Sequence, residues 1–456
     1  MRLKHHRSLG LFLAFLFICA PLGAFDEPFS FSKDSRVLVI APHPDDETLG
    51  TGGLIQSALE AGGDVKVVYL THGDYNEIAS IFFQKKPLLS KSDFIKSGLI
   101  RRKEAIEAMS VIGLDQRNLV FLGYPDFGTL NIWSKHWGER KPYRSFITRI
   151  NKVPYKDDFS YGRPYRGDNI VSDIEKILLL YRPTHVLVTA PFDLNTDHRA
   201  AYLYLHVALF DLQGKINSPK VLAYLIHEHR WPVPRKYEPN KPLEPPSHIS
   251  DEEGLKWITF NLKPAQVESK NQALLKYESQ IAYSRDFMLS FARTNELYCE
   301  PFYEKLNISQ LKEQLSFEKD KNETNSNEVN YWVQGNELWL DIRVSSPIDE
   351  LGPLNMEIFG YKHDTDFAKM PKLNLILLGG HLWARDGYKR LPDSGVHYDL
   401  RKKSLRVRIP LELLKSSDHL FVSTRTMRDD LSLDFGSWRI LEMPELVNGK
   451  RQNLLV

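Results

Sequence analysis

The sequence of 456 residues predicts a three-layer α/β fold built on a parallel sheet, followed by a smaller C-terminal β-sandwich. Two observations predict the first part. Short apolar runs alternate with amphipathic segments from residue 36 to about residue 226, and the runs have the length of buried strands. One observation predicts the second part: beyond residue 331 apolar residues recur at every second position, which is the period of a half-buried strand.

Five apolar runs indicate parallel strands covered on both faces, at residues 37–41, 65–70, 118–122, 184–190 and 221–226. Four amphipathic segments between them indicate helices, at residues 49–61, 99–112, 171–181 and 198–211. Residues 264–300 open with Pro264 and indicate one more helix that packs back on this domain. Two long polar and aromatic stretches, 75–98 and 127–170, interrupt the pattern. We expect them either to form the walls of a site or to decorate the surface.

A polar run at residues 318–328 marks a linker. The six short runs that follow it alternate as strands do, at residues 338–344, 354–361, 373–380, 405–411, 419–426 and 438–443. We therefore expect an α/β domain over residues 30–303, a linker over residues 304–330 and a β-sandwich domain over residues 331–445.

The first 24 residues have the layout of a secretory signal peptide. A basic start precedes an apolar run over residues 9–22, and Gly23 and Ala24 supply small residues before a polar segment. The alternative is a retained membrane anchor, but this run is shorter than the roughly 20 residues that a spanning helix needs. We expect cleavage after Ala24, export to the periplasm or beyond, and no stable membrane span in the mature protein.

Charge and cysteine content narrow the class of protein further. The net charge is +2, from 60 basic and 58 acidic residues, so no basic field for gripping nucleic acid is expected. Cys19 lies in the predicted signal peptide. The mature chain then keeps the single thiol of Cys299, which we expect to be buried, and no internal disulfide.

Histidine and carboxylate residues gather directly after two of the predicted strands. His43 and Asp46 lie in APHPDDETLG (41–50), and Asp193, Asp197 and His198 lie in PFDLNTDHRA (191–200). The carboxyl ends of parallel strands share one edge of a sheet, so both groups are expected there. Two histidines and one carboxylate are typical of a catalytic zinc site with an open position, although iron or cobalt also suits them. The alternative, a plain acidic helix cap, would crowd acids together without a cation.

These motifs resemble those of the PIG-L (LmbE-like) family of zinc-dependent N-deacetylases. HPDDE after a strand is followed by RRKEA (101–105), by FLGYPD (121–126) and by DH after a later strand, in the order that the family shows. The resemblance covers roughly residues 36–230 and implies a Rossmann-like fold. It also implies that His43, Asp46 and His198 bind zinc.

The resemblance assigns further roles. Asp45 is similar to the family's general base, a carboxylate that takes a proton from water as the water attacks an acetyl carbonyl. Arg101 is similar to a substrate-contacting arginine; the alternative is a salt bridge to Glu104. We expect Asp126 to face the cleft and to contact substrate, with a structural role as the alternative. Asp197 is expected to orient a metal ligand.

One departure from the family pattern concerns the second motif. Many members read HPDH there, and the first histidine assists the oxyanion or the leaving group. This chain has Asn195 at that place, which can contact substrate through a hydrogen bond but cannot act as an acid. Either Asp45 moves the proton alone, or His227 at the end of a strand fills the role. The alternative for His227 is a ring that is satisfied by the backbone.

Together these observations predict an exported enzyme that removes acetyl groups from N-acetylglucosamine-type sugars of a glycan or glycoconjugate. Tyr75, Phe127 and Trp231 are expected to stack on sugar rings or to serve plain packing. The alternatives are an amidase of another N-acyl amine and a sugar-binding or scaffolding protein without turnover. Oligomerisation stays open.

Overall fold

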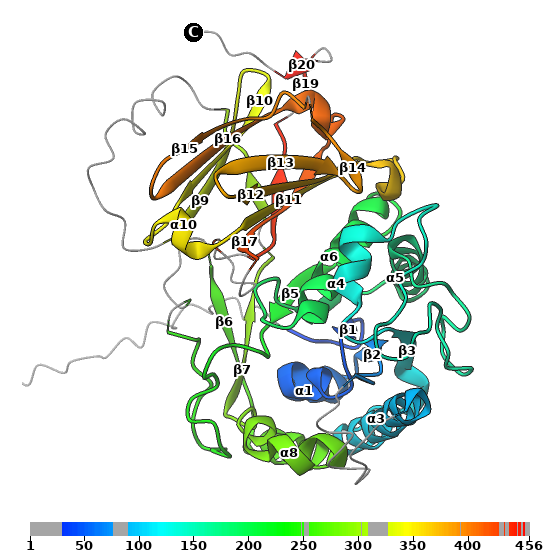
Figure 1. The fold of residues 1–456 in the computed structure, drawn as a ribbon. Helices are drawn as coiled ribbons and strands as arrows, with labels where there is room; N and C mark the ends of the chain where they lie inside the picture. Colours follow the sequence, from blue (N-terminus) through cyan, green and yellow to red (C-terminus); the bar gives the residue numbers. More distant parts are fainter. Residues whose placement is uncertain are drawn as a thin grey trace, which may run out of the picture. The chain divides into compact units, whose positions relative to one another are not determined.

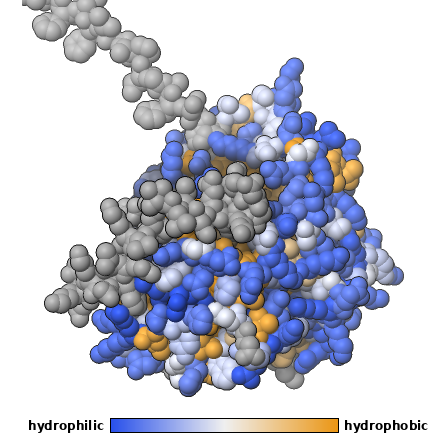
Figure 2. All heavy atoms as spheres, turned by 90° about the horizontal axis from the view of Figure 1, so that it is seen from above, coloured by the Kyte–Doolittle hydropathy of each residue, from blue (hydrophilic) through white to orange (hydrophobic). Residues whose placement is uncertain are grey.

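The computed structural model describes residues 30–75, 90–247, 249, 255–301, 303–308, 327–392, 394–427, 433, 437–444, 446–447 and 450–451. The predicted signal peptide, most of the stretch at 75–98 and most of the linker lie outside the described residues. Among the described helices, none combines the length and the apolar character that a membrane crossing needs. The face drawn in Figure 2 is largely hydrophilic, with small separate hydrophobic patches.

A seven-stranded sheet in the order β3-β2-β1-β4-β5-β7-β6 organises the first part of the chain (Figure 1). The five predicted parallel strands are present as β1 (Arg36–Ala41), β2 (Asp64–Thr71), β3 (Leu119–Tyr124), β4 (His185–Thr189) and β5 (Lys220–Tyr224). β6 (Trp257–Asn261) and β7 (Asn295–Cys299) extend the sheet with antiparallel pairings. Cys299 is buried, as predicted, and carries a free thiol.

Helices pack in two groups around this sheet. One group consists of α1 (Asp46–Glu60), α3 (Lys91–Ile112) and α7 (Pro264–Leu274), and the other of α4 (Thr129–Lys135), α5 (Gly167–Tyr181) and α6 (Thr196–Asp211). Ser90 and Asp93 form a reciprocal capping box, which starts α3 well before the predicted residue 99. The prediction of one helix over 264–300 is wrong. A second helix, α8 (Glu278–Leu289), and β7 follow α7 there, and a turn at Leu275 and Lys276 separates the two helices.

The C-terminal region is rich in antiparallel strands. A four-stranded sheet has the order β15-β16-β10-β9, and a second sheet has the order β14-β13-β12-β11-β17-β18-β8. Their bounds are β8 (Tyr303–Lys305), β9 (Glu328–Gln334), β10 (Glu337–Arg343), β11 (Leu354–Tyr361), β12 (Lys372–Leu378), β13 (His381–Asp386), β14 (Lys389–Arg390), β15 (His397–Leu400), β16 (Ser404–Pro410), β17 (His419–Thr426) and β18 (Arg439–Glu442). The six predicted strands are among them. The short elements of this region are α10 (Ile348–Leu351), β19 (Leu446–Val447), β20 (Lys450–Arg451) and the 3₁₀ turns at Phe367–Lys369 and Leu411–Leu414. In the α/β region, one 3₁₀ turn, Gln116–Asn118, precedes β3.

An aromatic cluster joins the α/β region to the larger of these two sheets. Trp133 of α4 is fully buried and stacks on Phe359 at 5.8 Å between ring centroids. Phe421 and Trp438 meet the same indole edge-on. Lys372 is buried beside this cluster, with its Nζ 3.6 Å from the Phe367 ring centroid. The two regions therefore share a packed core.

Helix α1 lies very close to the strands beneath it. A Cβ on Gly50 would come within 2.2 Å of the Tyr224 ring, whereas a Cβ on Gly52 would have ordinary contacts at 3.4 Å. Buried Glu296 accepts hydrogen bonds from the backbone N–H groups of Gly53 and Leu54, and it pairs with buried Lys270 at 2.6 Å. These contacts fix the helix that begins within the HPDDE motif, at Asp46.

We expect Gly50→Ala to destabilise the protein by about 1–3 kcal/mol, because the added methyl group overpacks against β5. Gly52→Ala is the matched control. It adds the same group to the same helix at a tolerant position and is expected to be neutral, or stabilising by up to about 1 kcal/mol. Urea unfolding midpoints of both variants test this. If both substitutions change the unfolding midpoint equally, the close approach of Gly50 to β5 does not contribute to the free energy of unfolding.

Candidate active site

The two sequence motifs meet because β1 and β4 are neighbouring parallel strands. β1 ends at Ala41 and leads to His43 and Asp46, the first residue of α1. β4 ends at Thr189 and leads through a short loop into α6, which carries His198 in its first turn. The structure thus brings the three predicted metal ligands to one edge of the sheet.

The three side chains converge on a single point. Asp46 Oδ2 lies 3.1 Å from His43 Nδ1 and 3.1 Å from His198 Nε2, and the two nitrogens are 3.3 Å apart. All three residues are buried. One ion with bonds of about 2 Å to nitrogen and oxygen can reach such a set.

Carboxylates behind the two histidines decide which nitrogen of each ring faces this point. His43 Nε2 lies 3.0 Å from Asp126 Oδ1 and 3.4 Å from Asp197 Oδ2, and His198 Nδ1 lies 3.0 Å from Asp193 Oδ2. A carboxylate only accepts hydrogen bonds, so each of these nitrogens carries a proton. In the neutral rings, the opposite nitrogens then direct their lone pairs toward Asp46. Three electron-pair donors without a proton between them suit a divalent cation.

The electrostatics favour a positive charge at the same point. Burial lowers the pKa of His198, yet Asp193 and Asp46 outweigh it and raise that pKa to about 9. The pKa of His43 is likewise well above its ordinary value, because the carboxylate of Asp126 opposes the effect of burial. The surrounding carboxylates therefore stabilise a cation, which is either a proton on each ring or a metal ion.

Asp45 has a strained backbone beside this set. Its φ of 125° lies in a region that residues other than glycine rarely adopt. Burial raises the pKa of the Asp45 carboxyl to about 8, against the opposing effect of Arg101. Asp45 Oδ2 accepts a hydrogen bond from Arg101 Nη2 at 3.0 Å, and its backbone N–H donates to Glu47. Strain of this kind is typical of functional positions.

Arg101 anchors the loop that carries Asp45. Its guanidinium is buried and donates to the carbonyl oxygens of Pro44 and Gly73 as well as to Asp45. The alternative of a salt bridge to Glu104 is wrong, because Glu104 accepts from Ser279 instead. Arg101 also lines the cavity described below, so its contact with substrate stays a prediction.

The other predicted residues lie around the same point. Asp126 lines the cavity and also accepts from the Tyr75 backbone N–H. Asp197 is fully buried and accepts from the backbone N–H groups of Phe127 and Thr129 while it contacts His43. Asn195 lines the cavity and caps α6 by accepting from the Asp197 N–H. Asp197 thus contacts a predicted metal ligand, and its role in orienting that ligand stays a prediction.

His227 reaches the site from the end of β5. Its ring centroid lies 4.8 Å from that of His198, and burial lowers its pKa to about 4, so the ring is neutral. Its backbone N–H donates to Asp193, but no hydrogen bond to either ring nitrogen is found within the described residues. The alternative of a ring satisfied by backbone groups is therefore wrong for the described part of the chain.

A cavity of about 510 Å³ opens over these residues. Tyr75 and Phe127 meet edge-on at 5.2 Å on its rim, and α8 contributes Tyr283 and Phe287. Trp231 is not in this cavity: its indole is buried against Phe291, so of its two expected roles the structure supports plain packing and not sugar stacking. Sequence patterns missed the α8 residues and Arg235, because no motif marks them.

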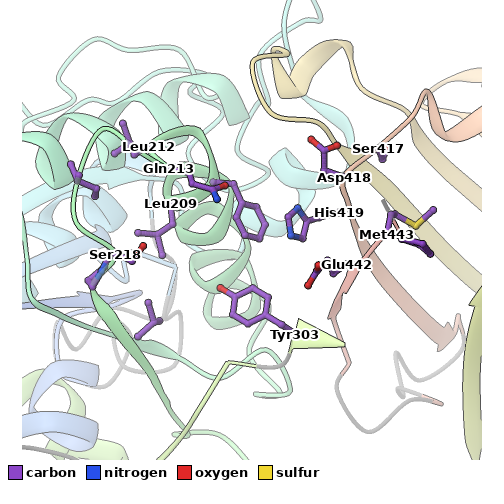
Figure 3. Close-up of a pocket in the computed structure, with 15 residues that line it drawn as sticks. Leu209, Leu212, Gln213, Ser218, Tyr303, Ser417, Asp418, His419, Glu442 and Met443 are labelled. Atoms are coloured by element: carbon purple, nitrogen blue, oxygen red, sulfur yellow. The ribbon is translucent and has the colours of Figure 1, made fainter. Parts of the chain in front are cut away.

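A second cavity of about 680 Å³ lies between the end of α6 and the strands β8, β17 and β18 (Figure 3). Tyr303, His419 and Glu442 are among its lining residues. It is larger than the first cavity, but none of the predicted catalytic or metal-binding residues lines it. We therefore assign the active site to the smaller cavity at the strand ends.

The fold and the site define an α/β protein with a candidate two-histidine, one-carboxylate metal centre at the carboxyl edge of its sheet. Residues 38–209 form a PIG-L family domain and match the family model described as GlcNAc-PI de-N-acetylase. The resemblance expected from the motifs is thereby confirmed.

Relatives and solved structures share parts of this chain. Two curated relatives from Mycobacterium sp. strains KMS and JLS are named 1D-myo-inositol 2-acetamido-2-deoxy-alpha-D-glucopyranoside deacetylase. Each is 34% identical over 100 residues, which make up 22% of this chain and 31% of the relative. The match therefore spans less than a third of their length.

Among solved structures, N,N'-diacetylchitobiose deacetylase from Pyrococcus horikoshii is 20% identical, with a TM-score of 0.38 over 60% of this chain and 86% of its own. The zinc-inhibited form of teicoplanin deacetylase Orf2 is 19% identical, with a TM-score of 0.38 over 58% and 97% of the two chains. The 4-carboxy-2-hydroxymuconate hydratase GalB from Pseudomonas putida is 18% identical, with a TM-score of 0.36 over 56% and 82%.

We expect Asp193→Asn to weaken zinc affinity about 10- to 100-fold, because His198 loses the charged acceptor that fixes its tautomer. Competition titration against a zinc chelator measures the change. Asp341→Asn removes a similarly buried carboxylate that contacts Arg343 and Arg406 in the C-terminal region, and it serves as the control. Unchanged affinity in Asp193→Asn would show that His198 is not held by this contact.

Proposed function

We propose that this protein is a metal-dependent N-deacetylase that hydrolyses the acetamido group of N-acetylglucosamine-type sugars in a glycan or glycoconjugate. One observation carries the proposal: His43, Asp46 and His198 converge within hydrogen-bonding distance of one another, with Asp45 beside them. The PIG-L domain and the names of the two mycobacterial relatives, which act on an acetamido sugar, support the substrate class.

The donor set suits zinc, and iron or cobalt are the other ions that such ligands accept. When bound, a divalent ion supplies an electrophile for the amide carbonyl and lowers the pKa of a water molecule to about 7. The ligands to this ion would be His43, Asp46 and His198. The orientation of the two histidine rings would be kept by the carboxylates behind them, those of Asp126, Asp197 and Asp193.

Asp45 is the proposed general base. Arg101 holds Asp45 Oδ2, so we assign proton transfer to Asp45 Oδ1. In the ionised form of Asp45, Oδ1 takes a proton from water as the water oxygen bonds to the acetyl carbon. The carbon–nitrogen bond then breaks, and the same proton passes to the sugar nitrogen. The products are the free amine and acetic acid, which releases its proton to solvent and leaves as acetate.

His227 is the proposed donor to the acetyl oxygen, in the role that Asn195 cannot fill as an acid. The support is geometric: the His227 ring lines the cavity, lies beside His198 and keeps both ring nitrogens free of described partners. Asn195 already uses its side-chain oxygen to cap α6. A hydrogen-bond donor at the developing oxyanion is typically a large term in amide hydrolysis.

The two alternative functions, an amidase of another N-acyl amine and a binding or scaffolding protein, predict different results with zinc-loaded protein. An amidase of another N-acyl amine would release acid from a non-sugar amide in preference to N-acetylglucosamine. A binding or scaffolding protein would bind zinc and sugar without turnover. The intact set of Asp45, Asp46 and two histidines favours an enzyme, because a pure binding site does not need a buried, strained carboxylate beside a metal centre.

The proposal extends to the rest of the chain. The two C-terminal sheets share one apolar cluster, to which β9, β10 and β16 contribute from one sheet and β11, β12 and β17 from the other, and this supports a β-sandwich. The apolar run at residues 9–22 supports export with cleavage after Ala24. N-terminal sequencing of the exported protein would test the cleavage site.

Acetate release from a panel of N-acetyl sugars, by zinc-loaded protein with and without a chelator, tests the proposed activity. In this assay we expect Asp45→Asn to keep its zinc and to lose at least about 10²-fold in kcat, because the proton acceptor is gone. Metal analysis of the same sample separates loss of the base from loss of the ion. Turnover equal to that of the wild type would remove Asp45 from the mechanism.

We expect His227→Ala to lower kcat by about 10²-fold with little change in KM, because the donor acts on charge that develops during the reaction. His227→Gln keeps a donor and should recover part of the rate. Asn195→Ala is the comparison variant, and its main expected effect is a loss of about 1 kcal/mol of stability at the start of α6. A larger loss of kcat in Asn195→Ala than in His227→Ala would move the donor role to Asn195.

A further inference from the structure

We infer that the second cavity, between the end of α6 and the strands β8, β17 and β18, binds sugar units that carry a free amine. Such units are what the proposed reaction produces, so the identity of the ligand rests on the proposed function. The site itself is separate from the active site. The inference is carried by walls that combine aromatic rings, uncommitted hydrogen-bonding groups and carboxylates.

The second cavity lies at the opposite edge of the sheet from the active site. Val221 lines it near the start of β5, whereas His227 follows the end of the same strand and lines the active-site cavity. Phe210, in the last turn of α6, lines the second cavity, whereas His198 is in the first turn. From His198 to Phe210 the helix advances about 18 Å. A ligand in the second cavity therefore does not compete with the reacting sugar.

The polar wall of this cavity comes from one face of the larger C-terminal sheet. In the pairing register, His419 of β17 lies opposite Glu442 of β18, and Glu442 lies opposite Lys305 of β8. Side chains two residues apart on a strand share a face, so Tyr303 joins this set. By the same rule the face carries Phe421, which packs in the aromatic cluster of the shared core. The cavity thus opens where that core ends.

Aromatic rings form one corner of the cavity. The His419 ring stacks on Phe210 with 4.3 Å between centroids and an interplanar angle of 16°, and the Tyr303 ring lies 6.2 Å from Phe210. Tyr303 is 47% exposed, so part of its ring is available to a ligand. Aromatic faces favour the apolar CH groups of a flat ligand, and their negative charge density favours an ammonium group.

Hydrogen-bonding groups on the walls are available to a ligand. The Tyr303 hydroxyl and the Gln213 side-chain amide line the cavity, and neither has a hydrogen-bond partner within the described part of the chain. Figure 3 shows Gln213 and Ser218 on the helix side, across from Asp418 and Glu442 on the strand side. Hydroxyl, amide and carboxylate groups can all pair with sugar hydroxyls. The volume of about 680 Å³ lies within the range of roughly 300–1,000 Å³ typical of small-molecule sites.

The charge of the walls favours a cation over an anion. Asp418 and Glu442 are carboxylates, and the described lining includes no lysine or arginine. Burial lowers the pKa of His419 against the opposing effect of Glu442 and Asp418, so the ring is neutral near neutral pH. One oxygen of Asp418 accepts from the His363 backbone N–H. Lys305 lies 3.8 Å from Glu442, but both side chains are exposed, and such pairs contribute little.

An amino sugar fits these walls as a whole. Its ring offers CH groups to the aromatic corner and hydroxyl groups to the polar side chains, and its amine can pair with Glu442. A sugar amine is comparable to an α-amino group, whose pKa is about 8, so it is mostly protonated near neutral pH. The acetylated sugar has the same ring but no charge. The second cavity would therefore hold the protein on parts of a glycan that already carry free amines.

The test is calorimetric binding to the full chain, as zinc-loaded Asp45→Asn protein so that no acetylated ligand is consumed. Three ligands are compared near neutral pH: a β-1,4-linked glucosamine tetramer, the corresponding N-acetylglucosamine tetramer, and spermine, a linear tetraamine without a sugar ring. We expect Glu442→Gln to weaken binding of the glucosamine tetramer about tenfold, because a charge-assisted contact is lost. Binding of the acetylated tetramer should change by less than about twofold, because that ligand is neutral.

Glu304→Gln is the matched control. Glu304 is a partly exposed carboxylate on β8 that pairs with Arg439 at 3.2 Å and does not line the cavity. Its substitution removes the same charge and one surface ion pair, so affinity for the glucosamine tetramer should stay within about twofold. Tyr303→Ala tests the sugar face at an exposed ring. It should weaken binding of the glucosamine tetramer more than binding of spermine.

The outcomes separate this inference from the proposed function. Equal effects of Glu442→Gln and Glu304→Gln on the glucosamine tetramer would overturn the site. Equal losses for spermine and the glucosamine tetramer in both Glu442→Gln and Tyr303→Ala would overturn its assignment to a sugar. Acetate release by the wild type tests the proposed function independently. Release without Glu442-dependent binding overturns this inference alone, whereas Glu442-dependent binding without release supports the site while the deacetylase proposal fails.

Discussion

A buried concentration of carboxylates around two histidines is the constraint on which the site depends. Asp46 faces both rings, while Asp126, Asp197 and Asp193 hold them from behind. Negative groups at this density are costly to bury unless a cation lies among them. Two of them, Asp46 and Asp197, lie in the first turns of α1 and α6, where the helix dipole favours negative charge. The carboxyl ends of the strands thus form a buried, negatively charged site that a bound cation stabilises.

The rest of the α/β region fixes the helices that bear these charges. Gly50 lets α1 lie directly on Tyr224 of β5, and the Lys270–Glu296 pair holds the middle of the same helix. Arg101 ties the Asp45 loop to α3, which keeps that residue in a strained conformation. Such rigidity matters because a catalytic carboxylate that shifts by an ångström loses much of its effect.

Local patterns in the sequence were sufficient to predict the five parallel strands and the meeting of His43, Asp46 and His198, since strand ends place their following residues at one edge. These local patterns could not predict the contacts between residues that only tertiary packing brings together. Asp193 and His227 meet because β4 and β5 are neighbours, and no spacing along the chain encodes that. Trp231 lies in a segment without a regular period, so the sequence left open whether its indole packs in the interior, as it does against Phe291, or contacts a sugar. The walls from α8 follow from a helix break after Leu274 that the apolar pattern does not mark.

In the proposed mechanism, the donor role that the family motif gives to a histidine at the position of Asn195 passes to His227. β4 and β5 lie side by side, so a residue that follows either strand reaches the same region above the sheet. Asn195 serves α6 as a cap, and the ring at position 227 comes to lie beside His198 from the neighbouring strand. Catalysis depends on where a donor stands relative to the reacting atoms and not on its order in the chain. A missing motif residue is therefore weak evidence against activity when the adjacent strand end supplies an unpartnered ring at the same place.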